Sequence, residues 1–140
     1  MDKTMLFLAE KLAKEKHAGQ YDKAGQPYIK HVQFVAEQMK TDLEKTVAWL
    51  HDVVEDTDVT LGEIYVEFGE EVALAVETLT RKKHESYADF IVRVKNNNLA
   101  CKVKIADLNH NMDLSRLKEV SASDLKRLEK YQKALAFLKG

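Results

Sequence analysis

The sequence has few of the residues that interrupt regular structure. Its 140 residues include five glycines, one proline and one cysteine, whereas average usage is about 7% glycine and 5% proline. A sandwich or propeller needs many turns, so this scarcity argues against a turn-rich β fold. The lone Cys101 excludes an intramolecular disulfide framework and fits a reducing compartment.

The sequence also lacks an excess of charge and long apolar runs. Lys and Arg total 22 against 23 Asp and Glu, so no broad positive field favours nucleic acid or an anionic membrane as partner. No stretch approaches the roughly 18 uncharged apolar residues of a membrane span, and the start of the chain lacks the apolar region of a signal peptide. We expect a cytoplasmic protein with no nucleic-acid or membrane partner. The sequence does not determine the oligomeric state.

The residues that are present favour one all-α domain. A length of 140 residues falls within the roughly 100 to 200 residues of a single domain, so we expect residues 1–140 to form one compact multi-helix unit. Residues 102–106 also fit a buried strand locally, but partners for a strand are scarce. Apolar residues at helical spacing predict helices over 3–17 with Asp2 as a possible N-cap, 28–39, 43–54 with Thr41 as a cap, 60–69, 70–80, 86–95, 99–111 and 123–139.

The predicted helix over 43–54 carries the first chemical signal. His51 falls on its inward stripe, and Asp52, Glu55 and Asp56 follow at spacings of three and four residues, which gathers three carboxylates on an adjoining face. A divalent cation would offset their mutual repulsion. An acidic helix end beside one buried, hydrogen-bonded histidine is the alternative interpretation.

Two residues elsewhere in the sequence, His31 and Asp107, also favour a metal site. Asp107 interrupts an apolar helix face, and burying an unpaired carboxylate costs several kcal/mol or more, so a metal or cationic partner is expected there. With His31, His51 and Asp52 it makes a mixed nitrogen and oxygen set, which suits Mn²⁺, Fe²⁺, Co²⁺ or Zn²⁺. Hydrolysis of a phosphoester near neutral pH needs a metal-activated water, with carboxylates such as Glu55 and Asp56 to move protons.

At these residues the chain resembles a known family, the HD metal-dependent phosphohydrolases. It most closely resembles the hydrolase half of RelA/SpoT-type enzymes and the free-standing small alarmone hydrolases. The matching segments lie between about residues 17 and 117 and are His17-Ala18-Gly19-Gln20, Gly25-Gln26-Pro27-Tyr28-Ile29-Lys30-His31, Leu50-His51-Asp52-Val53-Val54-Glu55-Asp56-Thr57, and Lys104-Ile105-Ala106-Asp107 through Asn111-Met112.

The resemblance implies an all-helical hydrolase that removes pyrophosphate from the 3′ position of guanosine tetra- or pentaphosphate. It implies that Glu55 and Asp56 are catalytic, that Lys23 faces the nucleotide, and that Asn111 helps to place substrate or water. It also implies a manganese ion, for which another divalent metal is an alternative. The implied metal ligands are His31, His51, Asp52 and Asp107.

The chain departs from the family at positions where basic residues are usual. Asp22 and Leu108 stand in such positions, and Asp113-Leu114 replaces a basic-polar pair. These changes remove positive charge from the expected substrate rim. They favour, as an alternative, a phosphohydrolase that acts on another nucleotide. A non-catalytic nucleotide-binding regulatory module is a separate alternative, and the presence of Glu55 and Asp56 beside the ligand set argues against it. The candidate cations that could compensate are Lys23, Lys30, Lys104 and Arg116, and a solvated surface cation is the alternative interpretation of each.

The remaining histidines are expected to have structural or surface roles. His110 is interpreted as a hydrogen-bonded packing residue or a partner of a metal ligand, rather than as a ligand itself. His17 and His84 are expected at the surface.

Overall fold

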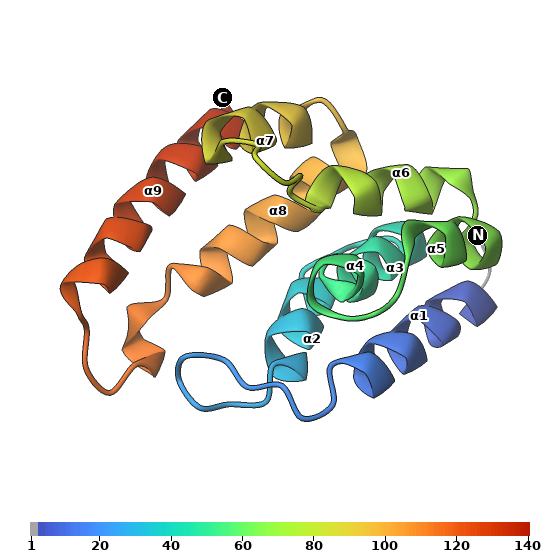
Figure 1. The fold of residues 1–140 in the computed structure, drawn as a ribbon, viewed down its shortest axis with the longest axis horizontal. Helices are drawn as coiled ribbons and strands as arrows, with labels where there is room; N and C mark the ends of the chain where they lie inside the picture. The colour runs from blue at the N-terminus through green and yellow to red at the C-terminus, as the bar shows by residue number, and fades with distance from the viewer. Residues whose placement is uncertain (1–2) are drawn as a thin grey trace.

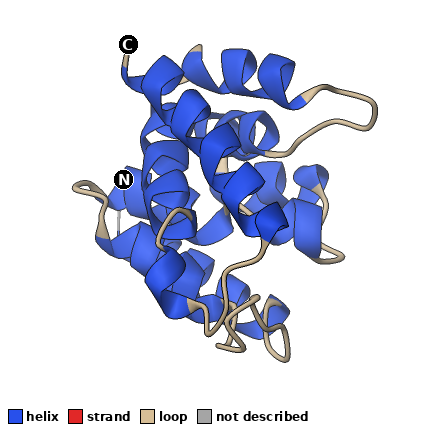
Figure 2. Ribbon diagram, turned by 90° about the vertical axis from the view of Figure 1, so that its left-hand side faces the viewer, coloured by secondary structure: helices blue, strands red, loops and turns tan. Residues whose placement is uncertain are grey.

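The computed structural model describes residues 3–140, and helices account for most of this range (Figures 1 and 2). Within it no strand forms, and Tyr21 and Pro27 make one isolated antiparallel bridge. The predicted all-α class is confirmed, whereas the expected N-cap Asp2 lies outside the described residues. The helices are α1 (Lys3–Lys16), α2 (Ile29–Glu37), α3 (Asp42–Leu50), α4 (Val53–Asp56), α5 (Leu61–Phe68), α6 (Glu70–Leu79), α7 (Tyr87–Lys95), α8 (Asn98–Asn111), the 3₁₀ turn η1 (Leu114–Arg116) and α9 (Ala122–Lys139).

Helix α8 runs through the centre of the fold (Figure 1). It packs against α2, α3, α6, α7 and α9, and Val103 and Leu108 are fully buried among them. Residues 102–106 lie inside this helix, so the buried-strand alternative is wrong. The central helix thus contributes buried residues to contacts with several neighbours while keeping Lys102 and Asn109 exposed.

The start of α3 is fixed by the predicted cap. The Thr41 hydroxyl accepts the Glu44 N–H at 3.1 Å, and the Glu44 carboxylate accepts the Thr41 N–H at 3.3 Å. This capping box satisfies two N–H groups that the helix itself leaves free. Lys102 of α8 also donates to Glu44, at 2.8 Å, so the same carboxylate links α3 to the central helix.

The predicted continuous helix over 43–54 is wrong, because the chain breaks at His51-Asp52. The His51 ring donates from Nδ1 to the carbonyl oxygen of Ala48 at 2.6 Å. In an uninterrupted helix that carbonyl would accept the N–H of Asp52, so the side chain competes with the backbone for the same acceptor. The helix resumes as α4 at Val53, which leaves His51 and Asp52 at a corner.

The apolar core extends from α1 to α9. Ala9 and Ala13 are fully buried at one end, and Ala134 and Leu138 close the other. The long helix α9 keeps charged residues on its outer side. Among residues 3–140, no helix combines the length and the apolar character that crossing a bilayer requires.

Candidate metal and catalytic site

Four side chains from three parts of the sequence converge at the corner between α3 and α4. His31 comes from α2, His51 and Asp52 from the corner, and Asp107 from α8. One ligand atom of each lies within 4.8 Å of all the others. His31, His51 and Asp107 are at most 5% exposed. The fold therefore brings together all four residues expected to bind the metal.

The ring of His51 is oriented for coordination. Its Nδ1 donates to a main-chain carbonyl, which can only accept, so in the neutral ring Nε2 carries the lone pair. That Nε2 lies 2.9 Å from Asp52 Oδ2 and 3.6 Å from Asp107 Oδ1. It is buried, and among the described residues neither carboxylate nor any other group meets it with normal hydrogen-bond geometry. A lone pair facing two carboxylates requires a cation between them, either a metal ion or a proton.

The charges of the cluster are strongly coupled. Burial alone would lower the pKa of His51, but the carboxylates of Asp52 and Asp107 outweigh it and raise that pKa well above its usual value. Burial would likewise raise the pKa of Asp52, but His51 holds it at about 2. Both carboxylates therefore remain ionised and favour a positive charge between them.

Asp107 has the cationic partner that its burial requires. Lys104 Nζ lies 2.9 Å from Asp107 Oδ2, and this charge overcomes the effect of burial and holds the pKa of Asp107 well below its usual range. Asn111 donates to Oδ1 at 3.2 Å, and His31 Nε2 lies 2.7 Å from the same oxygen. Lys104 thus faces inward to the cluster rather than standing on the substrate rim.

Two residues that the sequence did not assign to the site, Tyr28 and His17, pack beside the cluster. The Tyr28 hydroxyl donates to Asp52 Oδ2, and Tyr28 precedes His31 by about one helical turn, a spacing that signals a shared face. His17 was expected at the surface, and this is wrong because it is only 1% exposed. Its ring packs 5.2 Å from that of Tyr28, and its Nδ1 bonds Gln20 Oε1 at 2.8 Å.

Glu55 and Asp56 flank the cluster on α4, where both side chains reach solvent. Burial of part of each carboxyl, together with the charge of Asp52, raises the pKa of both above the usual carboxyl values. A raised pKa brings proton exchange by a carboxyl group closer to neutral pH, which suits a general acid or base.

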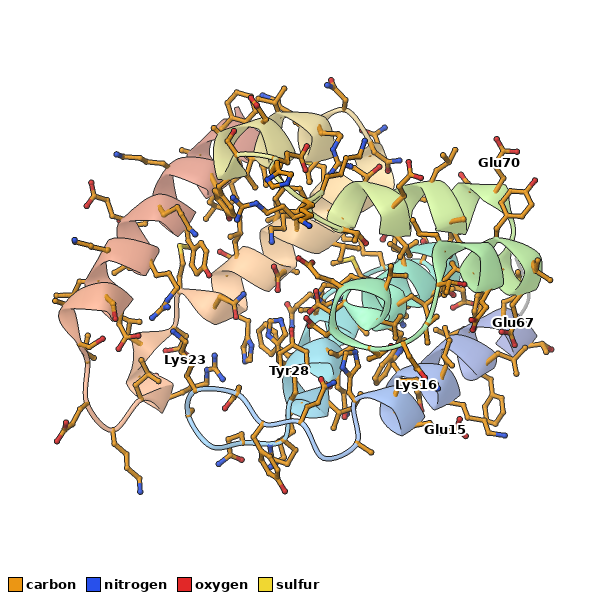
Figure 3. The ribbon with its side chains drawn as sticks, viewed as in Figure 1. Glu15, Lys16, Lys23, Tyr28, Glu67 and Glu70 are labelled. Atoms are coloured by element: carbon orange, nitrogen blue, oxygen red, sulfur yellow. The ribbon has the colours of Figure 1, made fainter. Side chains whose placement is uncertain are left out.

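A cavity of about 320 Å³ opens beside the cluster. Tyr28 and Asn111 border it, and Lys23 lies on the loop that forms another wall. Figure 3 shows Lys23 and Tyr28 on this side of the molecule and Glu67 at the far end. The cavity is large enough for part of a small ligand.

Asp22 and Leu108, which stand where basic residues are usual in the family, have structural roles in this fold. Asp22 pairs with Arg116 at 3.0 Å and accepts the N–H groups of Ala24 and Gln26 at 2.9 Å each, so it orders the loop. Leu108 is fully buried and belongs to the core rather than to a rim. Within the described residues, Lys23 is exposed and pairs with no carboxylate.

His110 occupies the packing position expected for it. Its Nδ1 lies 2.7 Å from His31 Nδ1, and its ring stacks on Phe34 with centroids 4.2 Å apart. Burial and the neighbouring His31 lower the pKa of His110 to about 4, so its ring is neutral at physiological pH. His84 is exposed in a turn with a positive φ of 68°, in agreement with the expectation.

The chain is similar to known proteins over most of its length. The family described as HD domain matches residues 9–107. Proteins named guanosine-3′,5′-bis(diphosphate) 3′-pyrophosphohydrolase are similar: that of Borreliella burgdorferi is 30% identical over 79% of this chain and 19% of its own length, and that of Aquifex aeolicus 36% identical over 74% and 17%. The bifunctional (p)ppGpp synthase/hydrolase SpoT of Escherichia coli K12 is 34% identical over 72% and 16%.

The chain thus spans less than a fifth of the length of these relatives. A solved structure, described as a metazoan ortholog of SpoT that hydrolyzes ppGpp and plays a role in starvation responses, has a TM-score of 0.81 with 23% identity. The match covers 99% of this chain and 86% of that one. The helical arrangement is therefore shared over nearly the whole described chain.

Proposed function

The chain belongs to the HD domain family, and on this premise we propose that it is a metal-dependent phosphohydrolase that removes the 3′-pyrophosphate from guanosine tetraphosphate-type alarmones. The relatives named for this reaction support the choice of substrate. The observation that carries the proposal is a largely buried cluster in which one ligand atom from each of four side chains lies within 4.8 Å of the other three; the side chains are those of His31, His51, Asp52 and Asp107.

The ligand set fits a divalent cation. His31 and His51 contribute imidazole nitrogens, and Asp52 and Asp107 contribute carboxylate oxygens. We propose Mn²⁺ for the site because the family resemblance implies it, and the mixed nitrogen and oxygen set would also hold Fe²⁺, Co²⁺ or Zn²⁺. When bound, such an ion supplies an activated water and charge that stabilises the phosphoryl oxygens.

The chain's own residues carry the proton transfers. Glu55 and Asp56 take the proton from the attacking water and return one to the leaving 3′ oxygen, which their raised pKa values suit. Water adds to phosphorus as the bond from phosphorus to the 3′ oxygen breaks. The products are guanosine 5′-diphosphate and pyrophosphate, which balances the reaction.

The cavity beside the cluster is the proposed nucleotide site. Lys23 lines this cavity from the loop before α2. Asn111 lines it on the side of the cluster, where it also donates a hydrogen bond to Asp107. Arg116 and Arg127 line the same cavity but are paired with Asp22 and Asp124 at 3.0 and 2.7 Å. Lys23 is therefore the lining cation best able to pair with a phosphate.

A nucleotide panel incubated with Mn²⁺ tests the proposal. We expect pyrophosphate release from ppGpp by the wild type and none by Asp52→Ala. Asp58→Ala is the matched control, because Asp58 is an exposed carboxylate just beyond α4, and it should act like the wild type. Turnover of another nucleotide with ppGpp untouched would favour the alternative substrate. Tight nucleotide binding without product would favour a regulatory module.

A further inference from the structure

The ring of His31 contacts a different partner through each nitrogen. Nε2 lies 2.7 Å from Asp107 Oδ1, among the candidate ligand atoms, and Nδ1 lies 2.7 Å from Nδ1 of His110. The two ring planes are inclined by 26° with centroids 4.9 Å apart, and the two Nδ1 atoms are at hydrogen-bond distance. Two facing N–H groups would clash and two facing lone pairs would repel, so one proton lies between these nitrogens and couples the tautomers of the two rings.

A cation at the cluster decides which ring carries that proton. A neutral imidazole coordinates through an unprotonated nitrogen, so a His31 that binds through Nε2 carries its hydrogen on Nδ1. We propose that His110 is a positioning residue that accepts this Nδ1–H and thereby keeps the Nε2 lone pair of His31 free for the cation. The inference rests on the proposed function, because it assumes a metal at the cluster.

His110 is itself held in place for this role. Phe34 stacks on its ring at 4.2 Å with an inclination of 24°, which fixes the plane of the imidazole. Arg116 Nη2 donates to the His110 carbonyl oxygen at 3.4 Å, and Asp22 holds Arg116 at 3.0 Å. The contacts from Asp22 to Arg116 and from Arg116 to the His110 carbonyl thus hold the end of α8 that carries His110.

His51 shows why His31 needs such a partner. Nδ1 of His51 donates to the main-chain carbonyl of Ala48, which cannot donate back, so its tautomer is fixed by the backbone. His31 instead faces another imidazole, which can accept or donate according to its own tautomer. The orientation of one ligand ring is set by the main chain, and that of the other depends on one replaceable side chain.

Two substitutions separate this role from simple packing. His110→Phe keeps an aromatic ring on Phe34 but removes the acceptor, whereas His110→Asn removes the ring but keeps an oxygen that can accept. We expect His110→Phe to weaken Mn²⁺ binding roughly 10- to 100-fold, as loss of a partner that orients a ligand typically does. His110→Asn should bind Mn²⁺ more tightly than His110→Phe. Calorimetric titration of the metal-free chain measures both, without nucleotide.

A purely structural role predicts the reverse order, with His110→Phe close to the wild type, and that result would overturn the inference. The wild type loaded with diamagnetic Zn²⁺ gives a second test that needs no variant. Nitrogen NMR of the imidazoles should find His31 protonated at Nδ1 and His110 unprotonated at Nδ1, and the opposite assignment would refute the role. Wild-type chain that binds no divalent ion would overturn the proposed function as well, whereas normal metal binding by His110→Phe would overturn the inference alone.

Discussion

Asp107 and Glu85 each pair with a cation of the same chain, but their surroundings differ. Around Glu85, Arg93 of α7 donates from Nε and Nη2 to the carboxylate at 2.9 Å each, and to the carbonyls of Glu77 and Thr80 at 3.3 and 3.1 Å. The guanidinium thereby fastens the turn before α7 to the end of α6. Its hydrogen-bonding capacity is largely met within the chain.

The cluster around Asp107 is different. Lys104 neutralises one carboxylate, but Asp52 is close by and His51 Nε2 has no hydrogen-bond partner among the described residues. Negative charge therefore remains inside a buried space, which is costly unless a metal ion or a proton on His51 lies between the carboxylates. Charged residues near one another do not by themselves mark a site. A site is marked instead by ligand atoms whose charge and lone pairs the protein's own groups do not satisfy.

Removing proton-transfer groups at the unsatisfied cluster gives the largest expected effect. Glu55→Gln and Asp56→Asn should each lower kcat for the proposed substrate by about 100- to 10,000-fold, the contribution typical of general acid–base catalysis. Their effect on stability should be small, because both side chains reach solvent. Steady-state kinetics and thermal melts measure the two effects. Glu71→Gln, an exposed carboxylate on α6, is the control, and an unchanged kcat in both site variants would contradict their assignment.

The second-largest expected effect is a loss of thermal stability on metal removal, which should involve only the cluster around Asp107. At an ion concentration about 100 times its dissociation constant, binding to the folded state stabilises it by about 2.7 kcal/mol, so the Tm of chain loaded with Mn²⁺ should exceed that of chelated chain by several degrees. Asp107→Asn should lose most of this difference. Arg93→Met should retain it, because Arg93 belongs to the other cluster. Scanning calorimetry gives the values, and equal Tm values with and without Mn²⁺ would count against the metal site.

Lys23 tests whether an unpaired cation serves the substrate. Lys23→Ala should raise the KM for ppGpp about 10-fold, a loss of about 1.4 kcal/mol in phosphate pairing, while the affinity for Mn²⁺ stays unchanged. Lys11→Ala, an exposed lysine on α1, provides the control for net charge. An unchanged KM in Lys23→Ala would place the nucleotide elsewhere.

The satisfied cluster should affect stability alone. Arg93→Met should lower the free energy of unfolding by about 1 to 2 kcal/mol, since it removes charge-assisted bonds from a partly exposed site. Hydrolysis should not change. Urea denaturation measures the first effect, with exposed Lys83→Met as control. A loss of kcat in folded Arg93→Met would show that the two clusters are coupled.

The smallest expected effect is a pH dependence at Glu85. Hydrogen bonds from Arg93 and from the Lys82 backbone lower the pKa of Glu85 to about 2. A carboxyl whose pKa is lower in the folded state stabilises the fold above its unfolded pKa, and this contribution is lost as pH falls through the folded value. The stability difference between wild type and Glu85→Gln should therefore be full at pH 6 and shrink as pH falls from about 4.5 towards 2. A difference that is constant across this range in urea denaturation would disprove the account.

The pattern of the sequence was sufficient for most helices because helix signals are local. Apolar spacing reports neighbours three and four residues apart, and caps such as Thr41 and Thr60 bond within three residues. The same signals failed at His51, where a ring competes with the backbone for the Ala48 carbonyl. The spacing of apolar residues does not show whether the side chain or the backbone N–H will donate to that carbonyl.

By itself, then, the sequence determined the helical class and the ligand chemistry, because residue type fixes which atoms can bind a cation. Only the tertiary structure decided that His17 is buried, that Lys104 is drawn inward to Asp107, and which nitrogen of His31 and of His51 faces the cluster. These depend on contacts between α2, α8 and the corner after α3, which are distant in sequence. Packing of the core brings them together, and no local pattern carries that information.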